Sequence, residues 1–138
     1  MSKLELPMIL RLWESIGGTL IPEFQAVPRS PGVGRRLIDA VILPNGPKRQ
    51  AHWRDVRLVG EDVIAVQAKA QRLGMYLMGQ GVFSAELLRR AFHPAFIRSV
   101  ILCSADDLVL RPLLAPYPEV EVVLDAGAPI IPAEEELG

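Results

Sequence analysis

The chain has 138 residues, of which 50% are hydrophobic, and its formal net charge is -1. This length and composition predict one globular domain, and the near-neutral charge argues against a protein that coats nucleic acid by bulk charge. The single cysteine, Cys103, excludes a disulfide framework within the chain, and no segment reaches the roughly 20 apolar residues that cross a bilayer, so we expect a cytoplasmic protein.

A helix and a strand are the first predicted elements. Apolar residues recur at helical spacing over residues 6–16, and the pair Gly17-Gly18 ends this helix. Residues 19–27 then favour a strand. Pro22 indicates an edge position or a bulge in that strand, because proline has no N–H for the sheet ladder.

Two further predicted strands carry polar residues inside apolar runs. The strand at residues 36–43 contains Asp39, and the turn sequence Pro-Asn-Gly-Pro follows it. The strand at residues 63–66 runs on into Gln67-Ala68-Lys69. We expect these two strands to be neighbours in one mixed sheet, with the turn between them.

A long helix is predicted over residues 73–92, where apolar residues again have helical spacing. Two glycines, Gly79 and Gly81, lie inside it. Each lowers helix stability by about 1 kcal/mol relative to alanine, which indicates that something approaches the helix backbone closely there.

The C-terminal part predicts two strands, at residues 99–103 and 119–124, with a short helix between them. Ser104 and Asp107 resemble a capping box that opens this helix, and Pro112 is expected to limit it. The domain is therefore predicted to cover residues 1–125, and residues 126–138 to form a flexible acidic tail.

Asp39 needs a partner or a function, because burying an isolated carboxylate is costly. Gln67 and Lys69 are two residues apart in an extended strand, so their side chains leave the same face. If the two strands pair, all three residues converge at one place, which suits a divalent cation with a lysine beside it. The alternative is a structural ion pair between Asp39 and Lys69.

The order helix, three strands, helix, strand, with Asp39 on the second strand and Gln67-Ala68-Lys69 on the third, resembles the PD-(D/E)XK, or restriction-endonuclease-like, nuclease superfamily over residues 5–104. The resemblance implies an α/β fold with three α/β/α layers and a mixed central sheet. Its order would be αβββαβ, plus a C-terminal αβ extension. It also implies a metal-dependent nuclease that hydrolyses phosphodiester bonds in DNA.

The resemblance further implies a role for each residue of the candidate site. Asp39, Gln67 and the backbone carbonyl of Ala68 would bind Mg²⁺ or Mn²⁺, and Glu14 on the first helix would complete the site. Lys69 would position or activate the attacking water. All of these residues would be catalytic except Ala68, which would serve the metal alone.

The sequence departs from the superfamily at two positions. Ile38 stands where a proline usually precedes the aspartate, and Gln67 replaces the second carboxylate. An amide oxygen can bind Mg²⁺, but the site then has one negative charge fewer. The alternative function is therefore an inactive nuclease-fold module that binds or assembles within a larger defence or repair complex.

Basic residues are concentrated in one part of the chain. Residues 29–57 contain seven basic and two acidic residues. This segment predicts contacts with the phosphates of a nucleic acid. The resemblance implies DNA more than RNA as that partner. The expected contact residues are Arg35, Arg36, Lys48 and Arg49. The alternative is a solvated basic loop. Separately, we expect the chain to act on its target as a homodimer or as a subunit of a larger complex.

Overall fold

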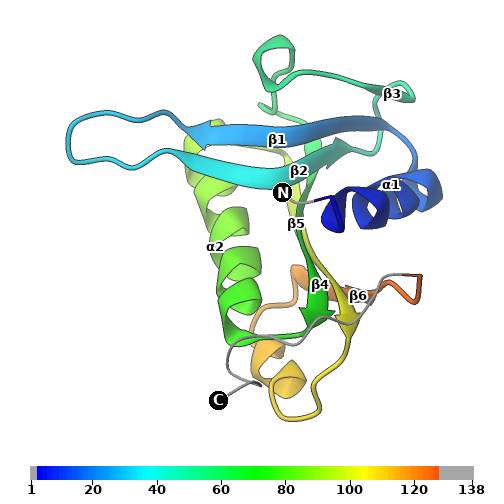
Figure 1. Cartoon of the computed structure of the whole chain (residues 1–138). Helices are drawn as coiled ribbons and strands as arrows, with labels where there is room; N and C mark the ends of the chain where they lie inside the picture. Colours follow the sequence, from blue (N-terminus) through cyan, green and yellow to red (C-terminus); the bar gives the residue numbers. More distant parts are fainter. Residues whose placement is uncertain (1–2, 128–138) are drawn as a thin grey trace.

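The computed structural model describes residues 3–127 and shows a mixed sheet with one long helix on each face (Figure 1). In chain order the helices and strands are α1 (Glu5–Ile16), β1 (Thr19–Val27), β2 (Arg36–Leu43), β3 (Arg49–Gln50), β4 (Asp62–Arg72), α2 (Met75–Phe92), β5 (Phe96–Ala105) and β6 (Val120–Leu124). Short 3-10 helices lie at η1 (Trp53–Asp55) and η2 (Arg111–Leu114). None of the helices among residues 3–127 is long and apolar enough to cross a membrane.

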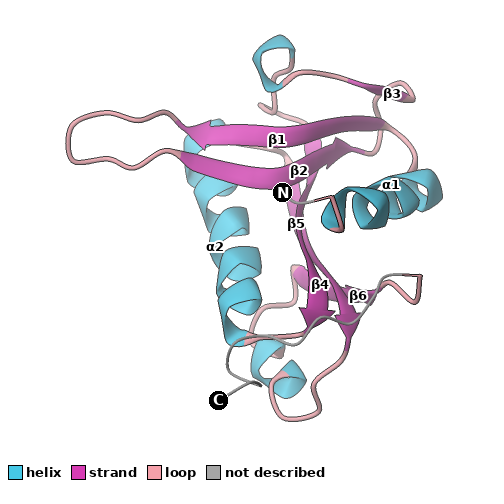
Figure 2. Ribbon diagram, in the orientation of Figure 1, coloured by secondary structure: helices cyan, strands magenta, loops and turns pink. Residues whose placement is uncertain are grey.

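The six strands lie in the order β3-β1-β2-β4-β5-β6. Antiparallel pairing joins β1 to β2 and β2 to β4, while β4, β5 and β6 are parallel to one another. The predicted α/β fold with a mixed central sheet is therefore confirmed, as is the pairing of the strands that carry Asp39 and Lys69. The loop between β1 and β2 projects beyond the sheet (Figure 2).

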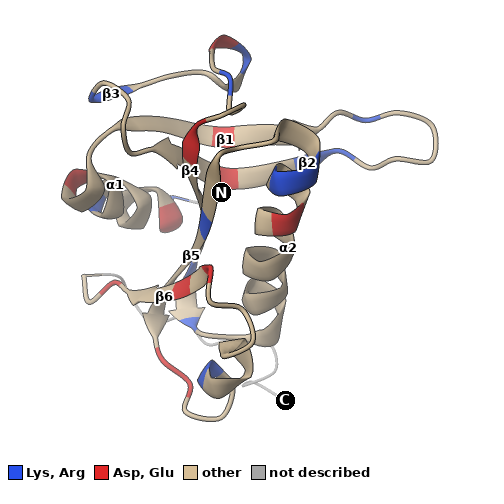
Figure 3. Cartoon of the chain, turned by 180° about the vertical axis from the view of Figure 1, so that it is seen from behind, with Lys and Arg blue, Asp and Glu red and all other residues tan. Residues whose placement is uncertain are grey.

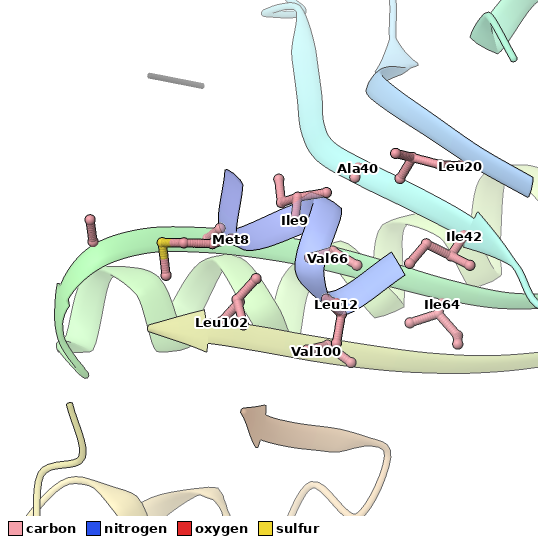
Figure 4. Close-up of a cluster of buried hydrophobic side chains, with 12 residues drawn as sticks. Met8, Ile9, Leu12, Leu20, Ala40, Ile42, Ile64, Val66, Val100 and Leu102 are labelled. Atoms are coloured by element: carbon pink, nitrogen blue, oxygen red, sulfur yellow. The ribbon is translucent and has the colours of Figure 1, made fainter. Parts of the chain in front are cut away.

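The two faces of the sheet are covered by different helices because neighbouring residues of a strand point to opposite sides. On one face Met8, Ile9 and Leu12 of α1 pack against Ile64 and Val66 of β4 and their neighbours (Figure 4). On the other face α2 packs against side chains of β4 and β5 that point the opposite way.

The first helix ends as its sequence predicts. Gly17 has φ 80° and Gly18 φ 78°, a left-handed region that side chains disfavour. The Gly17 N–H donates to the Trp13 carbonyl oxygen at 2.7 Å, which satisfies one of the last carbonyls of the helix. A side chain at Gly18 would also collide with the Leu43 carbonyl oxygen, 2.2 Å from the Cβ position. These two glycines therefore turn the chain directly into β1.

Of the two features expected at Pro22, an edge position or a bulge, the structure shows the edge position. Strand β3 pairs with β1 only at Thr19 and Leu20, so Pro22 faces an open edge. The next residue, Glu23, has φ 49°, but the irregularity in the pairing of β1 with β2 lies further along, between Gln25 and Val27.

The region after β5 differs from the prediction. Pro112 does not limit a helix that begins at Ser104; it stands at the start of η2. Asp107 instead closes a turn, because its Oδ1 accepts the N–H groups of Val109 and Leu110 at 2.9 Å each. Proline suits the start of a helix because its fixed φ is already helical and no N–H is needed there.

Two smaller expectations concern Cys103 and the C-terminal tail. Cys103 is fully buried, and burial raises the pKa of its thiol to about 11, so it acts as a small apolar core residue. Residues 128–138 of the predicted tail lie outside the described residues.

Candidate active site

The site lies where β2 and β4 stop pairing. Their last paired residues are Ala40 and Val66, and continuing this register by one residue sets Asp39 opposite Gln67. Beyond this point the Ala68 N–H bonds a side chain in place of a backbone carbonyl. The Asp39 Oδ2 accepts this N–H at 2.9 Å. The carboxylate is therefore attached to the peptide segment that joins Gln67 to Lys69.

The charged form of the Asp39 carboxyl group is destabilised by burial. Burial raises the pKa of its carboxyl group above the ordinary value, and the negative charge of Glu5 adds to this effect. The hydrogen bond from the Ala68 N–H and the positive charge of Lys69 lower the pKa but do not cancel the effect of burial. A desolvated carboxylate favours the approach of a cation.

Asp39 and Lys69 do not form the structural ion pair that was the alternative. Within residues 3–127 their side chains make no direct ion pair, and the half-buried Lys69 donates no side-chain hydrogen bond. Lys69 acts on Asp39 only through its charge. Its ammonium group thus keeps its three N–H donors for a water molecule or a phosphate oxygen.

Gln67 has a fixed orientation. Its side chain is 3% exposed, and its Nε2 donates to the Ser84 Oγ on α2 at 2.8 Å. The other amide atom, Oε1, is buried without a hydrogen-bond partner among the described residues. A buried unpaired acceptor loses about 1–3 kcal/mol of solvation, so its presence suggests that a ligand supplies the missing contact.

The Ala68 carbonyl group faces the same edge of β4 as Asp39. In an extended strand the N–H and C=O groups of one residue point to the same side, and Asp39 accepts the Ala68 N–H. Asp39, the amide oxygen of Gln67 and this carbonyl are hard oxygen donors, the type that Mg²⁺ and Mn²⁺ prefer.

The carboxylate on α1 that acts on this site is Glu5, not Glu14. Glu5 is 6% exposed, and its charge raises the pKa of Asp39. Glu14 lies nine residues further along the helix, is exposed, and pairs with Lys48 at 3.2 Å. Helical spacing explains the difference: nine residues correspond to about 13 Å along the axis and a half-turn around it.

No cluster of three His, Cys, Asp or Glu side chains that could hold a metal occurs among residues 3–127. A metal site here would depend on one or two carboxylates together with neutral oxygens. The amide and carbonyl donors that the sequence singled out are therefore essential to it.

The expected phosphate contacts fall into two separate groups (Figure 3). Arg35 and Arg36 lie where the β1–β2 loop enters β2, whereas Lys48 and Arg49 lie at β3, beside the opposite end of β1. The length of β1 separates the groups by roughly 26 Å. Lys48 is also engaged by Glu14 and lies 5.3 Å from the centre of the Trp13 ring. Only the first group borders the cleft described next.

A cleft of about 1120 Å³ separates the β1–β2 loop from α2 and reaches Gln67. One wall is formed by Val27, Gly32, Val33, Gly34, Arg36, Leu37 and Ile38. The other is formed by Met75, Tyr76, Gly79, Gln80, Phe83, Ser84, Glu86, Leu87 and Arg90 of α2. This cleft could not be predicted from the sequence, because it depends on how far the loop stands from the helix.

No protein-family model matches the chain, and no curated protein matches it. A solved structure that is similar to it is a chain of the EndoMS–dsDNA2 complex, with 13% sequence identity and a TM-score of 0.51. The match covers 90% of this chain and 46% of that one, so the present chain spans about half the length of its structural neighbour. At this identity the likeness shows a shared fold.

Proposed function

We propose that this chain is a metal-dependent nuclease that hydrolyses phosphodiester bonds in DNA, with Asp39, Gln67, the Ala68 carbonyl and Lys69 as its active site. One observation carries the proposal. A desolvated Asp39 carboxylate is held against a peptide segment that bears a buried oxygen and an ammonium group, neither of which has a partner within residues 3–127.

Each residue would have a distinct task. Asp39 would supply the negative charge that attracts Mg²⁺ or Mn²⁺, while Gln67 Oε1 and the Ala68 carbonyl would supply neutral ligands. The bound ion would polarise the scissile phosphate and favour ionisation of the attacking water. Lys69 would orient that water and stabilise negative charge on the phosphate, since its ammonium group has no partner in the described part of the chain.

Glu5 replaces Glu14 in this proposal. It is the carboxylate of α1 that acts on Asp39, so it would add the second negative charge that Gln67 does not provide. A second negative charge near Asp39 would favour the binding of a cation there.

Two observations favour DNA as the substrate. A protein solved in complex with double-stranded DNA has the same fold. Arg36 also lines the cleft that reaches Gln67, so a cation lies where a backbone phosphate would enter. A second copy of the chain or a larger complex would supply further target recognition.

The test combines metal calorimetry with cleavage of labelled DNA in Mn²⁺. Wild type should bind the ion and cut DNA, and Asp39→Asn should lose both properties. Lys69→Ala should lose cleavage while keeping or tightening metal binding, because it removes a nearby positive charge but no ligand. Gln67→Glu should tighten metal binding, because it adds a negative charge to the ligand set.

The second candidate function is a nuclease-fold module without chemistry, favoured by the neutral Gln67. It predicts that wild type binds DNA but neither binds Mn²⁺ nor cleaves. Restored metal binding and cleavage in Gln67→Glu alone would identify an inactivated nuclease. No metal binding in either protein would refute the proposed metal site.

A further inference from the structure

The two glycines of α2 have different surroundings. A Cβ at Gly81 would lie 2.5 Å from Ile101 of β5, so this glycine is required by packing within the chain. A Cβ at Gly79 would meet nothing within 4 Å. Gly79 lines the cleft, so packing within residues 3–127 does not explain why α2 has a residue there that disfavours helix.

Two aromatic rings flank the gap at Gly79. Tyr76 and Phe83 are seven residues apart, so they project from the same side of α2 into the lining of the cleft. They are 75% and 71% exposed, so they form an apolar surface on the part of the chain that the structure describes. Gly79 lies between them and leaves open the space that a side chain would fill.

The spacing of the rings matches stacked bases. Seven residues of α-helix rise about 10.5 Å, and both side chains lean in the same direction along the axis. Bases in a stacked strand rise about 3.4 Å each. Two bases between the rings would make three such steps, about 10.2 Å. The separation of the two rings along the axis of α2 therefore matches the height of two bases stacked between them.

The other groups in the cleft complement a nucleic-acid strand rather than a peptide surface. Arg36 provides positive charge for phosphates, while the lining carboxylate of Glu86 and the guanidinium of Arg90 are paired with each other at 2.6 Å. At the buried side, Gln80 Oε1 has no partner among residues 3–127 and can accept an N–H of a base.

We propose that the cleft between the β1–β2 loop and α2 binds unpaired bases of a nucleic-acid strand, stacked between Tyr76 and Phe83. The cleft reaches Gln67, so the strand held there would continue into the candidate metal site. This inference deepens the proposed nuclease function by naming its substrate as single-stranded or locally opened DNA. It rests on that function only for the claim that the bound strand is the strand cut.

The test measures binding without cleavage, in a chelator, by fluorescence anisotropy. The probes are a labelled oligothymidylate and an abasic strand of the same length and charge. Wild type should bind the oligothymidylate at least about fivefold more tightly, because stacking on an aromatic ring strengthens binding by about that factor or more per base. Equal affinity for the two strands would overturn the proposal.

Variants locate the site. Phe83→Ala, Tyr76→Ala and Gly79→Leu should each reduce the preference for bases, the first two by removing a ring and the third by filling the gap. Phe96→Ala is the matched control, because its ring is 57% exposed but lies outside this cleft. A preference that survives all three cleft variants, or that is lost equally in the control, would contradict the assignment.

Two further outcomes separate this inference from the proposed function. A wild type that prefers bases but cleaves nothing in Mn²⁺ would support the cleft while refuting the nuclease. If wild type cuts duplex DNA and the cleft variants cut it at the same rate, the nuclease function is supported and the proposed role of the cleft is refuted. A dimer that Phe83→Ala converts to monomers would make the cleft an interface between copies and overturn the proposal.

Discussion

A helix covers each face of the sheet, but the side chains between helix and sheet differ in polarity and packing. The α1 face is closed by apolar side chains, including Met8 and Ile9, which are fully buried. The α2 face contains the buried polar pair Gln67 and Ser84, and an open cleft beside them. The α1 face is mainly an apolar core with Glu5 at its border, whereas the α2 face has fewer apolar contacts beside Gln67 and keeps polar atoms in place.

The largest expected effect on stability comes from removing a buried side chain on the α1 face. Ile9→Ala should lower the free energy of unfolding by about 2–5 kcal/mol, because it leaves a cavity in a closed core. Phe83→Ala on the α2 face should change it by no more than about 0.5 kcal/mol, since that ring is 71% exposed. Urea unfolding of both variants measures the contrast. Similar losses would mean that Phe83 is part of the core.

The glycines of α2 sharpen the comparison within a single helix. Gly81→Ala should destabilise the protein by about 1–3 kcal/mol, because its new methyl group would overlap Ile101. Gly79→Ala should instead stabilise it by up to about 1 kcal/mol, since the methyl group meets nothing and alanine favours the helix. Thermal melts compare the two. A loss at Gly79 would show that the gap is needed for folding.

A smaller effect is expected when Ser84 is truncated. Ser84→Ala removes the acceptor of Gln67 Nε2 and should lower stability by about 1 kcal/mol. It should also weaken Mn²⁺ binding, because the amide is no longer fixed with its oxygen free. Calorimetry measures the Mn²⁺ affinity of both variants. Ser84→Thr is the control, because it keeps the hydroxyl that orients Gln67 and changes only the packing around it. Equal metal affinity in Ser84→Ala would exclude the orienting role.

The smallest effect is a pH-dependent one at Asp39. Its raised pKa means that the folded protein holds this proton more strongly than the unfolded chain, so wild type loses stability as pH rises from about 3.8 through the raised value. Asp39→Asn keeps an acceptor for the Ala68 N–H but has no charge. Its melting temperature, measured in a chelator, should exceed that of wild type at neutral pH but not at pH 3. A constant difference at all pH values would contradict the assigned cause.

Much of the fold was predictable because local signals and burial agree. Residues 19–27 and 36–43 form the strands that their apolar patterns predict, and Gly17-Gly18 ends α1. The two-residue strand β3 was missed because its pairing is set by β1, not by its own sequence. Pro112 was misjudged because proline can begin a helical turn as well as end one.

The site was predictable where it depends on strand register and unpredictable where it depends on helix rotation. Asp39 and the Gln67-Ala68-Lys69 segment meet because their strands pair as expected, and the observed register sets Asp39 opposite Gln67. Choosing between Glu5 and Glu14 required the position of α1 on the sheet, which the spacing of its apolar residues does not fix along the axis. The cleft required a distance between two segments far apart in the chain.

The hydrogen bond from the Ala68 N–H to Asp39 gives the site a built-in spectroscopic reporter. An amide proton bonded to a carboxylate shifts strongly when that carboxylate gains a proton or a metal, and Ala68 makes this bond in the described structure. The nitrogen–proton resonance of one residue therefore records the charge state of Asp39 directly. Titrations of acid, Mg²⁺ and oligonucleotide can be followed at this amide in solution without a turnover assay.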